Sequence, residues 1–518
     1  MFFDINSSGS LAAVMLAAAH RQLLATGDLS IENPAATVSE SVYNEYRKKL
    51  VEVIDELEVP YRKLFDDLDY FTFACDYPGS VNLFSRYDKA PYPVDDCVFR
   101  NADDARWGFP GRLLGGEARK LYQANCSLFL STDDVFFFDR YGGGGGFGQH
   151  SAETGAPILE NFGLSTDVVK ADATLDNWRM RHSSRASYDM LYVNSSGGGR
   201  NWSLKGKGAS YEDIPLTKPL IVHFTHSFSA SNPYNRDTIA GRWIHNGAFI
   251  YTGSHREPLL GAFNTPKDFA EEATEGYPLS LALHKKMGDQ FWTPWKLYYV
   301  GDPLYCFTSQ RKFVKSEPVL DSAREAKKVY DLAKRRSAIK LEDKIERNLL
   351  SLRTAVATGE YEDALKAVDK MFDYFDRRRK VEKELAALFC ESAIAYGAAL
   401  ENHELIAQCV EVASKHEAVN TEMGFWLYET AKLKMNGILK GIDSGEMTPE
   451  KAADELVRAV GPLMVAKLDS SGSKHFFGRL KELLNLKKLK GSKAKIKKAL
   501  VELAPKDSDM AKEVNKLK

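Results

Sequence analysis

Short apolar runs alternate with stretches of helical spacing through the middle of the chain. The runs are 126–131 (CSLFLS), 165–172 (STDVVKAD), 188–194 (YDMLYVN), 220–225 (LIVHFT), 248–252 (AFIYT) and 296–300 (KLYYV). We interpret each as a strand. Strands that alternate with helices predict a mostly parallel sheet with helices on both faces, that is, an α/β fold.

The stretch 220–260 is the centre of this pattern. It contains an apolar strand, a polar turn, a helix and a second strand, 248–252, which is followed by Gly253 and Ser254. This order predicts a β-α-β crossover between parallel neighbours in one sheet. Polar side chains just past strand ends are the usual location of a site in such sheets. We therefore expect a site near His226, Ser227 and Ser254.

The 518 residues are too many for one core and predict two or three domains. Residues 1–115 mix helical and strand signals with frequent breaks, such as the turn expected at 108–111, and are interpreted as an irregular α/β lead-in. Residues 116–310 form the predicted α/β domain. Residues 311–518 are rich in Lys, Glu, Ala and Leu, which predicts an all-α domain.

Weak repeat character is visible in the predicted helical domain. Residues 347–375 have the helix–turn–helix spacing of a tetratricopeptide-like unit, and residues 382–415 supply a second pair. Three copies at one period are not found, although a solenoid needs neighbouring repeats to bury its faces. We expect a helical domain with weak tetratricopeptide-like character and a basic tail.

Charge and cysteine usage exclude several classes of function. Lys plus Arg (70) nearly balances Asp plus Glu (71), so the overall charge does not favour nucleic acid or an anionic membrane. The six cysteines are scattered, without metal-ligand spacing, and predict buried reduced thiols with no metal or cofactor. No apolar run is long enough to span a bilayer. We expect a cytoplasmic protein, or an exported one if Met1 is not the natural start, because the apolar run after Asp4 lacks the basic flank of a signal peptide.

We interpret two low-complexity segments as structural. The glycine run 142–146 lacks the G-K-[ST] of a phosphate loop and is expected to be a surface loop. The tail 487–500 carries seven lysines but no aromatic residues, and acidic residues flank it. It predicts a solvated basic helix, with a nucleic-acid patch as the weaker alternative.

Four elements carry a resemblance to a known family. They are YDMLYVNSSGGGRNW (188–202), LIVHFTHSFSASNP (220–233), TIAGRWIHNGAFIYTGSHREP (238–258) and LYYVGDPLY (297–305). In their order and residue types they resemble the gingipain-type cysteine peptidases, whose fold is caspase-like. The resemblance implies a caspase-like sheet and a peptidase ancestry. It places a general-base His before a Gly after the first strand, and a nucleophilic Cys after the second.

The chain departs from this pattern at both catalytic positions. Ser196 precedes Gly197 where the family has His, and Ser227, beside His226, stands where it has Cys. A thiolate is a far better nucleophile near neutral pH than an unassisted hydroxyl. We therefore predict a catalytically degenerate module that binds a peptide or protein. The candidate binding residues are Asn194, Gly197, Trp202, Ser254, Arg256 and Asp302.

Two alternatives stay open, an active hydrolase and a purely structural scaffold. Neighbouring strand residues point to opposite faces, so His226 and Ser227 cannot form a dyad with each other. A hydrolase would use Ser227 with a distant base such as His255, or Cys306. Cys306 is expected at the rim of the same sheet edge, where Asp302 would cap a turn or neutralise His226.

Overall fold

We describe the protein from a computed structural model. The described residues are 1–4, 8–83, 91–102, 105–141, 145–284, 296–307, 328, 344–358, 361–377, 381–505 and 508–517. The glycine run 142–146 lies mostly outside them. The chain forms two compact units, one of Met1–Trp178 and Ala186–Arg311, the other of Arg179–Arg185 and Lys312–Lys518. We call them the sheet unit and the helical unit.

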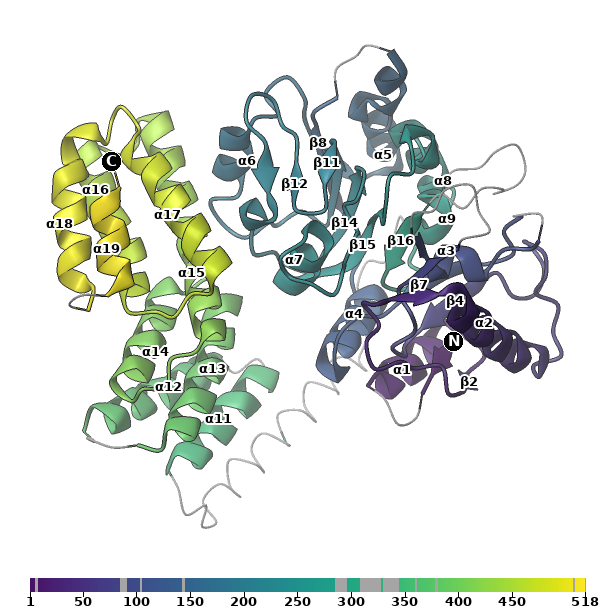
Figure 1. Cartoon of the computed structure of the whole chain (residues 1–518), viewed down its shortest axis with the longest axis horizontal. Coiled ribbons are helices and arrows are strands. Elements are labelled where there is room, and N and C mark those ends of the chain that lie inside the picture. Colours follow the sequence, from purple (N-terminus) through teal and green to yellow (C-terminus); the bar gives the residue numbers. More distant parts are fainter. Residues whose placement is uncertain are drawn as a thin grey trace. The chain divides into compact units, whose positions relative to one another are not determined.

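A ten-stranded sheet organises the sheet unit (Figure 1). In order across the sheet, the strands are β2 (Ala25–Thr26), β1 (Phe2–Phe3), β4 (Tyr70–Phe73), β7 (Phe109–Arg112), β16 (Leu297–Val300), β15 (Ala248–Ser254), β14 (Leu220–Thr225), β10 (Met190–Asn194), β8 (Asp134–Asp139) and β9 (Ser165–Val169). Every neighbouring pair is parallel except β15 and β16. The sheet therefore consists of two five-stranded parallel blocks that run in opposite directions.

The predicted α/β class is confirmed, and so is the central crossover. β14 and β15 are parallel neighbours, joined through α7 (Ile239–Asn246). The helix begins after Thr238, whose side chain accepts a hydrogen bond from the Gly241 N–H. It ends at Gly247, which has a φ of 129°. Local sequence signals thus define both ends of this helix.

Two local predictions were wrong. Residues 126–129 of the expected first strand belong to the helix α4 (Glu117–Phe129), and the strand is DVFFFD, β8, a few residues later. The helical run of 117–125 continues through Cys126, and the short apolar run CSLFLS cannot distinguish a strand from a buried helix end. Residues 109–111 of the expected turn lie within the strand β7, since Pro and Gly do not exclude a short buried strand. Through β1, β2, β4 and β7, residues 1–115 add four strands to the same sheet.

Helices cover both faces of the β15–β9 block. On one face α6 (Leu175–Arg181) and α7 supply Trp178 and Trp243, which are packed with Val222 and Phe224 of β14. On the other face Phe137 and Ile221 pack with three helices. Those helices are α5 (Ala156–Phe162), α8 (Pro266–Thr274) and α9 (Leu279–Ala282). Alternate residues of one strand therefore enter two separate cores.

Smaller elements complete the sheet unit. Its remaining helices are α1 (Ser10–His20), α2 (Glu40–Asp55) and α3 (Val94–Val98). Two small sheets have the strand orders β11 (Gly197–Gly198), β12 (Asn201–Trp202), β13 (Ala209–Ser210) and β3 (Thr37–Ser39), β5 (Ser80–Asn82), β6 (Tyr92–Pro93). In the first, β11 is an edge strand.

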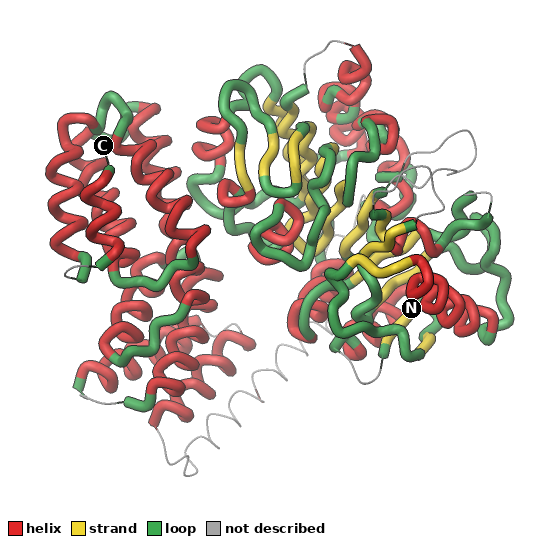
Figure 2. The backbone as a smooth tube through the Cα atoms, viewed as in Figure 1, coloured by secondary structure: helices red, strands yellow, loops and turns green. Residues whose placement is uncertain are grey.

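The described part of the helical unit contains helices and no strand, as Figure 2 shows. They are α11 (Lys344–Thr358), α12 (Tyr361–Asp376), α13 (Lys383–Ala399), α14 (His403–Lys415), α15 (Thr421–Ser444), α16 (Pro449–Val460), α17 (Ser470–Leu484), α18 (Lys493–Leu503) and α19 (Asp509–Lys516). The two expected helix pairs correspond to α11–α12 and α13–α14, so the all-α prediction is confirmed. Among the described helices, none combines the length and apolar character that crossing a bilayer requires.

Candidate functional site

The loops that follow β10 and β14 meet at the carboxyl edge of their parallel block. A Cβ placed on Gly197 would lie 2.5 Å from the Asn201 carbonyl oxygen and 2.8 Å from Nε2 of His226. A Cβ on Gly199 would collide with Oγ of Ser231. The chain can approach this closely only because both positions lack a side chain. The structure thus brings Gly197 and His226 together.

His226 is buried against a glycine and an aromatic ring. Its residue is 2% exposed and its ring centre lies 6.2 Å from that of Phe224. Neither ring nitrogen has a hydrogen-bond partner among the described residues. Burial lowers the pKa of His226 to about 4, and nearby backbone groups oppose only part of this effect. The imidazole is therefore neutral near pH 7.

Ser227 begins a tight turn and is only partly buried. Phe228, the next residue, has a φ of 64°, a left-handed conformation that costs a non-glycine residue about 1 kcal/mol. The Ser231 N–H closes the turn by donating to the Phe228 carbonyl oxygen at 3.0 Å. The turn therefore places the Ser227 hydroxyl at the strand end, and the strained backbone conformation belongs to Phe228.

His223 lies on the opposite face of β14 from His226. Its Nε2 is 3.2 Å from Oγ1 of Thr225, and its ring is 4.5 Å from that of Tyr192. Burial lowers the pKa of His223 to about 3. His223 is therefore a core residue.

The end of β15 adds Ser254 and His255 to this edge. The Ala230 N–H donates to the Ser254 carbonyl oxygen at 2.8 Å, and the Ser254 hydroxyl donates to the carbonyl oxygen of Arg256. His255 is 5% exposed, and burial lowers its pKa to about 4. Ser254 therefore has a structural partner, and Arg256, half-buried, belongs to the same turn.

Polar residues that the sequence analysis did not single out stand at the ends of β8 and β10. The Asp139 carboxylate accepts hydrogen bonds from the N–H groups of Tyr141 and Ala152 at 2.8 and 3.0 Å. The Tyr141 hydroxyl donates to the Ser195 carbonyl oxygen at 2.5 Å. Burial raises the pKa of Asp139. The signal was available, since Asp139 closes the apolar run VFFF, but the strand had been assigned one segment too early.

Two of the expected binding residues are packed inside. Asn194 is 1% exposed and its amide donates to the carbonyl oxygen of His150 at 2.5 Å. Trp202 is also 1% exposed, and its ring centre lies 5.7 Å from that of Trp178. Both side chains are packed in the interior next to the sheet edge, so they offer no exposed surface to a ligand.

Asp302 and Cys306 were expected at this edge, and the structure places them at the opposite one. β16 is antiparallel to β15, with Leu297 opposite Ser254, so the residues after β16 lie beyond the amino ends of β14 and β15. There the Asp302 carboxylate is 2.7 Å from Nε2 of His20, not beside His226. The Cys306 thiol donates to the carbonyl oxygen of Leu304 at 3.3 Å. Strand direction was the missing information, because a short strand has the same pattern in either direction.

The remaining thiols are buried in the cores. Burial raises the pKa of Cys75, Cys126 and Cys390 to about 12, and it also raises the pKa of Cys409 well above its usual value. All six cysteines are free, and only Cys306 is partly exposed. A thiol with a raised pKa forms little thiolate at neutral pH, so these groups are poor nucleophiles.

A buried ion pair fixes the loop that carries the Ser227 turn. The Arg112 guanidinium pairs with Asp95, and its Nη1 donates to the hydroxyl of Tyr234 at 2.7 Å. Arg112 also lies 5.3 Å from the ring centre of Tyr298. Tyr234 is at the far end of the loop after β14, so this pair anchors that loop to β7. The crossover arginine Arg242 is likewise buried and pairs with Glu212 at 3.3 Å.

Groups of three or more His, Cys, Asp or Glu residues with metal-binding geometry are not found within the described ranges. No protein-family model matches the chain, and searches of curated proteins and of solved structures found no significant match. The candidate site therefore has to be interpreted from its own geometry.

Proposed function

We propose that the sheet unit is a peptide-binding module with gingipain-like ancestry and a degenerate catalytic edge. The four elements that carry the resemblance correspond to β10, β14, β15 and β16, which are consecutive neighbours in the sheet. The positions that correspond to the family's base and nucleophile, Ser196 and Ser227, are at the ends of adjacent strands. This arrangement supports the ancestry, and the residue types argue against retained thiol chemistry.

The observation that carries the binding proposal is the glycine edge strand β11. Gly197 is exposed and Gly198 is half-buried, and neither carries a side chain that would obstruct an approaching backbone. An extended peptide can add to such an edge through main-chain hydrogen bonds. The turn at Ser227 lies beside it, since Gly199 contacts Ser231 and Phe228. A bound peptide would thus run past the degenerate nucleophile position.

Catalysis by the residues at this edge is disfavoured. A hydroxyl nucleophile needs a general base within hydrogen-bond reach. His226 is buried against Gly197 with its pKa lowered to about 4, which makes it a weak base. Cys306 lies at the other edge of the sheet and cannot substitute. The alternative function, a hydrolase that uses Ser227, would need a base from elsewhere.

The test measures binding and turnover of a fluorescent peptide library by the full chain. Gly198→Glu should weaken binding at least tenfold, because its Cβ has room, with only Oδ1 of Asn201 at 3.8 Å, while the side chain occupies the edge. Gly261→Glu is the matched control, since a Cβ there meets nothing within 4 Å. We expect this control to bind normally.

Two other results would replace the proposal. Peptide turnover that disappears in Ser227→Ala would establish a hydrolase. Failure of every library peptide to bind would favour the structural scaffold. A peptidyl thiol-reactive probe run alongside should give no adduct by intact mass, because all the thiols near the sheet are buried or lie at the wrong edge.

A further inference from the structure

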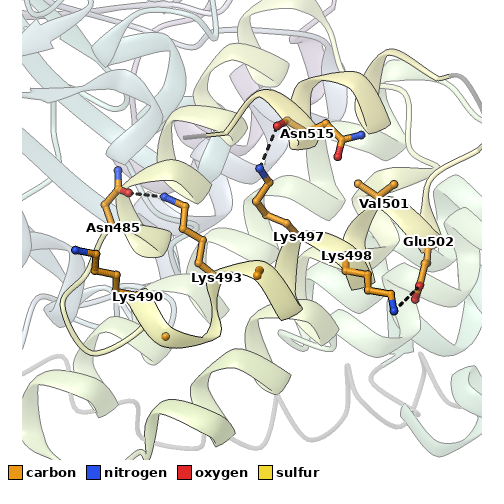
Figure 3. A pocket seen from close by; sticks show the side chains of 10 residues that line it. Asn485, Lys490, Lys493, Lys497, Lys498, Val501, Glu502 and Asn515 are labelled. Atoms are coloured by element: carbon orange, nitrogen blue, oxygen red, sulfur yellow. Dashed lines mark hydrogen bonds and ion pairs between the residues drawn. The ribbon is translucent and has the colours of Figure 1, made fainter.

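The helical unit contains a cavity of about 1030 Å³ near its carboxyl end. It is lined by α18, by the short helix η6 (Lys490–Ser492) that precedes α18, and by single asparagines that follow α17 and belong to α19. The lining residues are Asn485, Lys490, Gly491, Lys493, Ala494, Lys497, Lys498, Val501, Glu502 and Asn515 (Figure 3). Four of these ten residues are lysines, so the cavity has a strong positive charge.

Helical spacing explains why the lysines converge. Lys490, Lys493 and Lys497 are three and four residues apart, which places their side chains on one helix face. Figure 3 shows Lys493 directed toward Asn485 and Lys497 toward Asn515. Like charges at such spacings repel each other, and the fold holds them together at one cavity.

Among the described residues, no carboxylate pairs with any of these three lysines. Nζ of Lys493 donates to Oδ1 of Asn485 at 2.8 Å, and Nζ of Lys497 donates to the carbonyl oxygens of Asn515 and Leu517 at 3.0 and 2.8 Å. All three acceptors are neutral. No described carboxylate lies within 4.0 Å of Lys490, Lys493 or Lys497.

Other lysines of α18 and α19 are paired with carboxylates. Lys495, on another face of α18, lies 2.8 Å from Asp454, and Lys516 of α19 lies 2.6 Å from Glu513. Lys498, at the cavity rim, is 3.9 Å from Glu502. The cavity therefore brings together three lysines that have no described carboxylate partner, as a site for an anion requires.

The lining also indicates what kind of anion fits. Peptide recognition depends on aromatic or large aliphatic anchors in apolar pockets, and among the lining side chains only Val501 and Ala494 are apolar. Single-stranded nucleic acid needs stacking platforms, and the lining contains no aromatic residue. Several ammonium groups around one cavity instead match a compact ligand with several phosphate groups, for which lysine serves as a point charge.

We propose that this cavity binds a small polyphosphorylated ligand through Lys490, Lys493 and Lys497. The proposal is independent of the function of the sheet unit. It predicts that affinity falls as salt rises, because each lysine–phosphate contact is screened. It also predicts that a chain of phosphates binds more tightly than orthophosphate, because it reaches all three ammonium groups.

Isothermal titration of the full chain with sodium tripolyphosphate at fixed ionic strength tests the proposal. We expect Lys490→Gln/Lys493→Gln to weaken tripolyphosphate binding at least tenfold, and Lys497→Gln to weaken it further. Lys495→Gln is the matched control, since it removes a lysine of the same helix outside the cavity, and it should bind within twofold of the natural chain. Circular dichroism checks that each variant keeps its helices.

Four outcomes would overturn the proposal. They are absence of tripolyphosphate binding, an equal loss in Lys495→Gln, equal affinity for orthophosphate, and tighter binding of an acidic peptide or of vesicles that carry phosphoinositide headgroups. The second would indicate unspecific charge attraction, and the last would indicate a macromolecular partner.

Discussion

The titratable side chains at the carboxyl edge of the sheet differ in burial and charge from those at the cavity beside α18. At the sheet edge His226 and His255 are 2% and 5% exposed, and burial holds them neutral. At the cavity Lys490 is exposed, and Lys493 and Lys497 are half-buried beside neutral oxygens. An uncharged edge suits main-chain hydrogen bonding, and a solvent-exposed cationic cavity suits a polyanion.

Acid should affect the two units unequally, and this is the largest effect we expect. Five histidines of the sheet unit have pKa values lowered to about 3 or 4 by burial: His223, His226, His245, His255 and His284. Unfolding restores a pKa near 6.5, so the unfolded state binds more protons. Stability is therefore complete above pH 6.5 and is lost as pH falls toward 4, by about 1 kcal/mol per histidine per pH unit.

Urea unfolding at pH 7.5, 6.0 and 5.0, followed by tryptophan fluorescence, measures this loss. In the helical unit burial also lowers the pKa of His403, whereas the sheet unit contains the five histidines named above. The helical signal should consequently resist acid better than the sheet unit. A pH-independent midpoint for the sheet unit would contradict the burial of these histidines.

Removing a buried charge should destabilise the protein far more than removing an exposed one. Asp95→Ala leaves the Arg112 guanidinium buried without its carboxylate, and we expect a loss of about 3–5 kcal/mol in the free energy of unfolding. Asp454→Ala breaks the exposed pair with Lys495 and should cost less than about 1 kcal/mol. Similar losses in the two variants, measured by urea unfolding, would show that the contrast in burial is wrong.

Adding one methyl group at the sheet edge should have an intermediate effect. Gly197 has a φ of 150°, and its Cβ would meet both Asn201 and His226, so Gly197→Ala should cost about 1–3 kcal/mol. Gly198→Ala is the matched control, because its Cβ meets only Oδ1 of Asn201 at 3.8 Å. Thermal unfolding should separate the two variants. Equal melting temperatures would mean that the two loops do not approach as closely as described.

A single change at the cavity should hardly alter stability. Lys493→Gln removes the like-charge contact with Lys497 at i,i+4, and the free energy of unfolding should change by no more than about 0.5 kcal/mol. Tripolyphosphate affinity should nevertheless fall. If Lys493→Gln instead destabilised the protein strongly, the hydrogen bond to Asn485 would be structural and the lysine would serve the fold.

Much of the fold could be predicted from local pattern. β14 matches the predicted strand at both ends, and the cap at Thr238 and the Gly247 terminus of α7 followed from standard helix signals. The first strand was misplaced because the amphipathic end of α4 and a short buried strand have the same apolar composition. Of the candidate site, the pattern predicted only that polar residues such as His226 and Ser254 follow the ends of neighbouring parallel strands, and the close approach of Gly197 to His226 depends on the loop conformations.

The sequence by itself determined the alternation of strands and helices, the all-α carboxyl half, and the serines at the two positions where the family resemblance expects His and Cys. Only the tertiary structure decided that β16 runs against β15, which separates Asp302 and Cys306 from the candidate site. It also decided that His226 is neutral and that Lys490, Lys493 and Lys497 line one cavity with Asn515. Strand direction, burial and the convergence of distant side chains depend on contacts between segments far apart in the chain, and no local pattern encodes them.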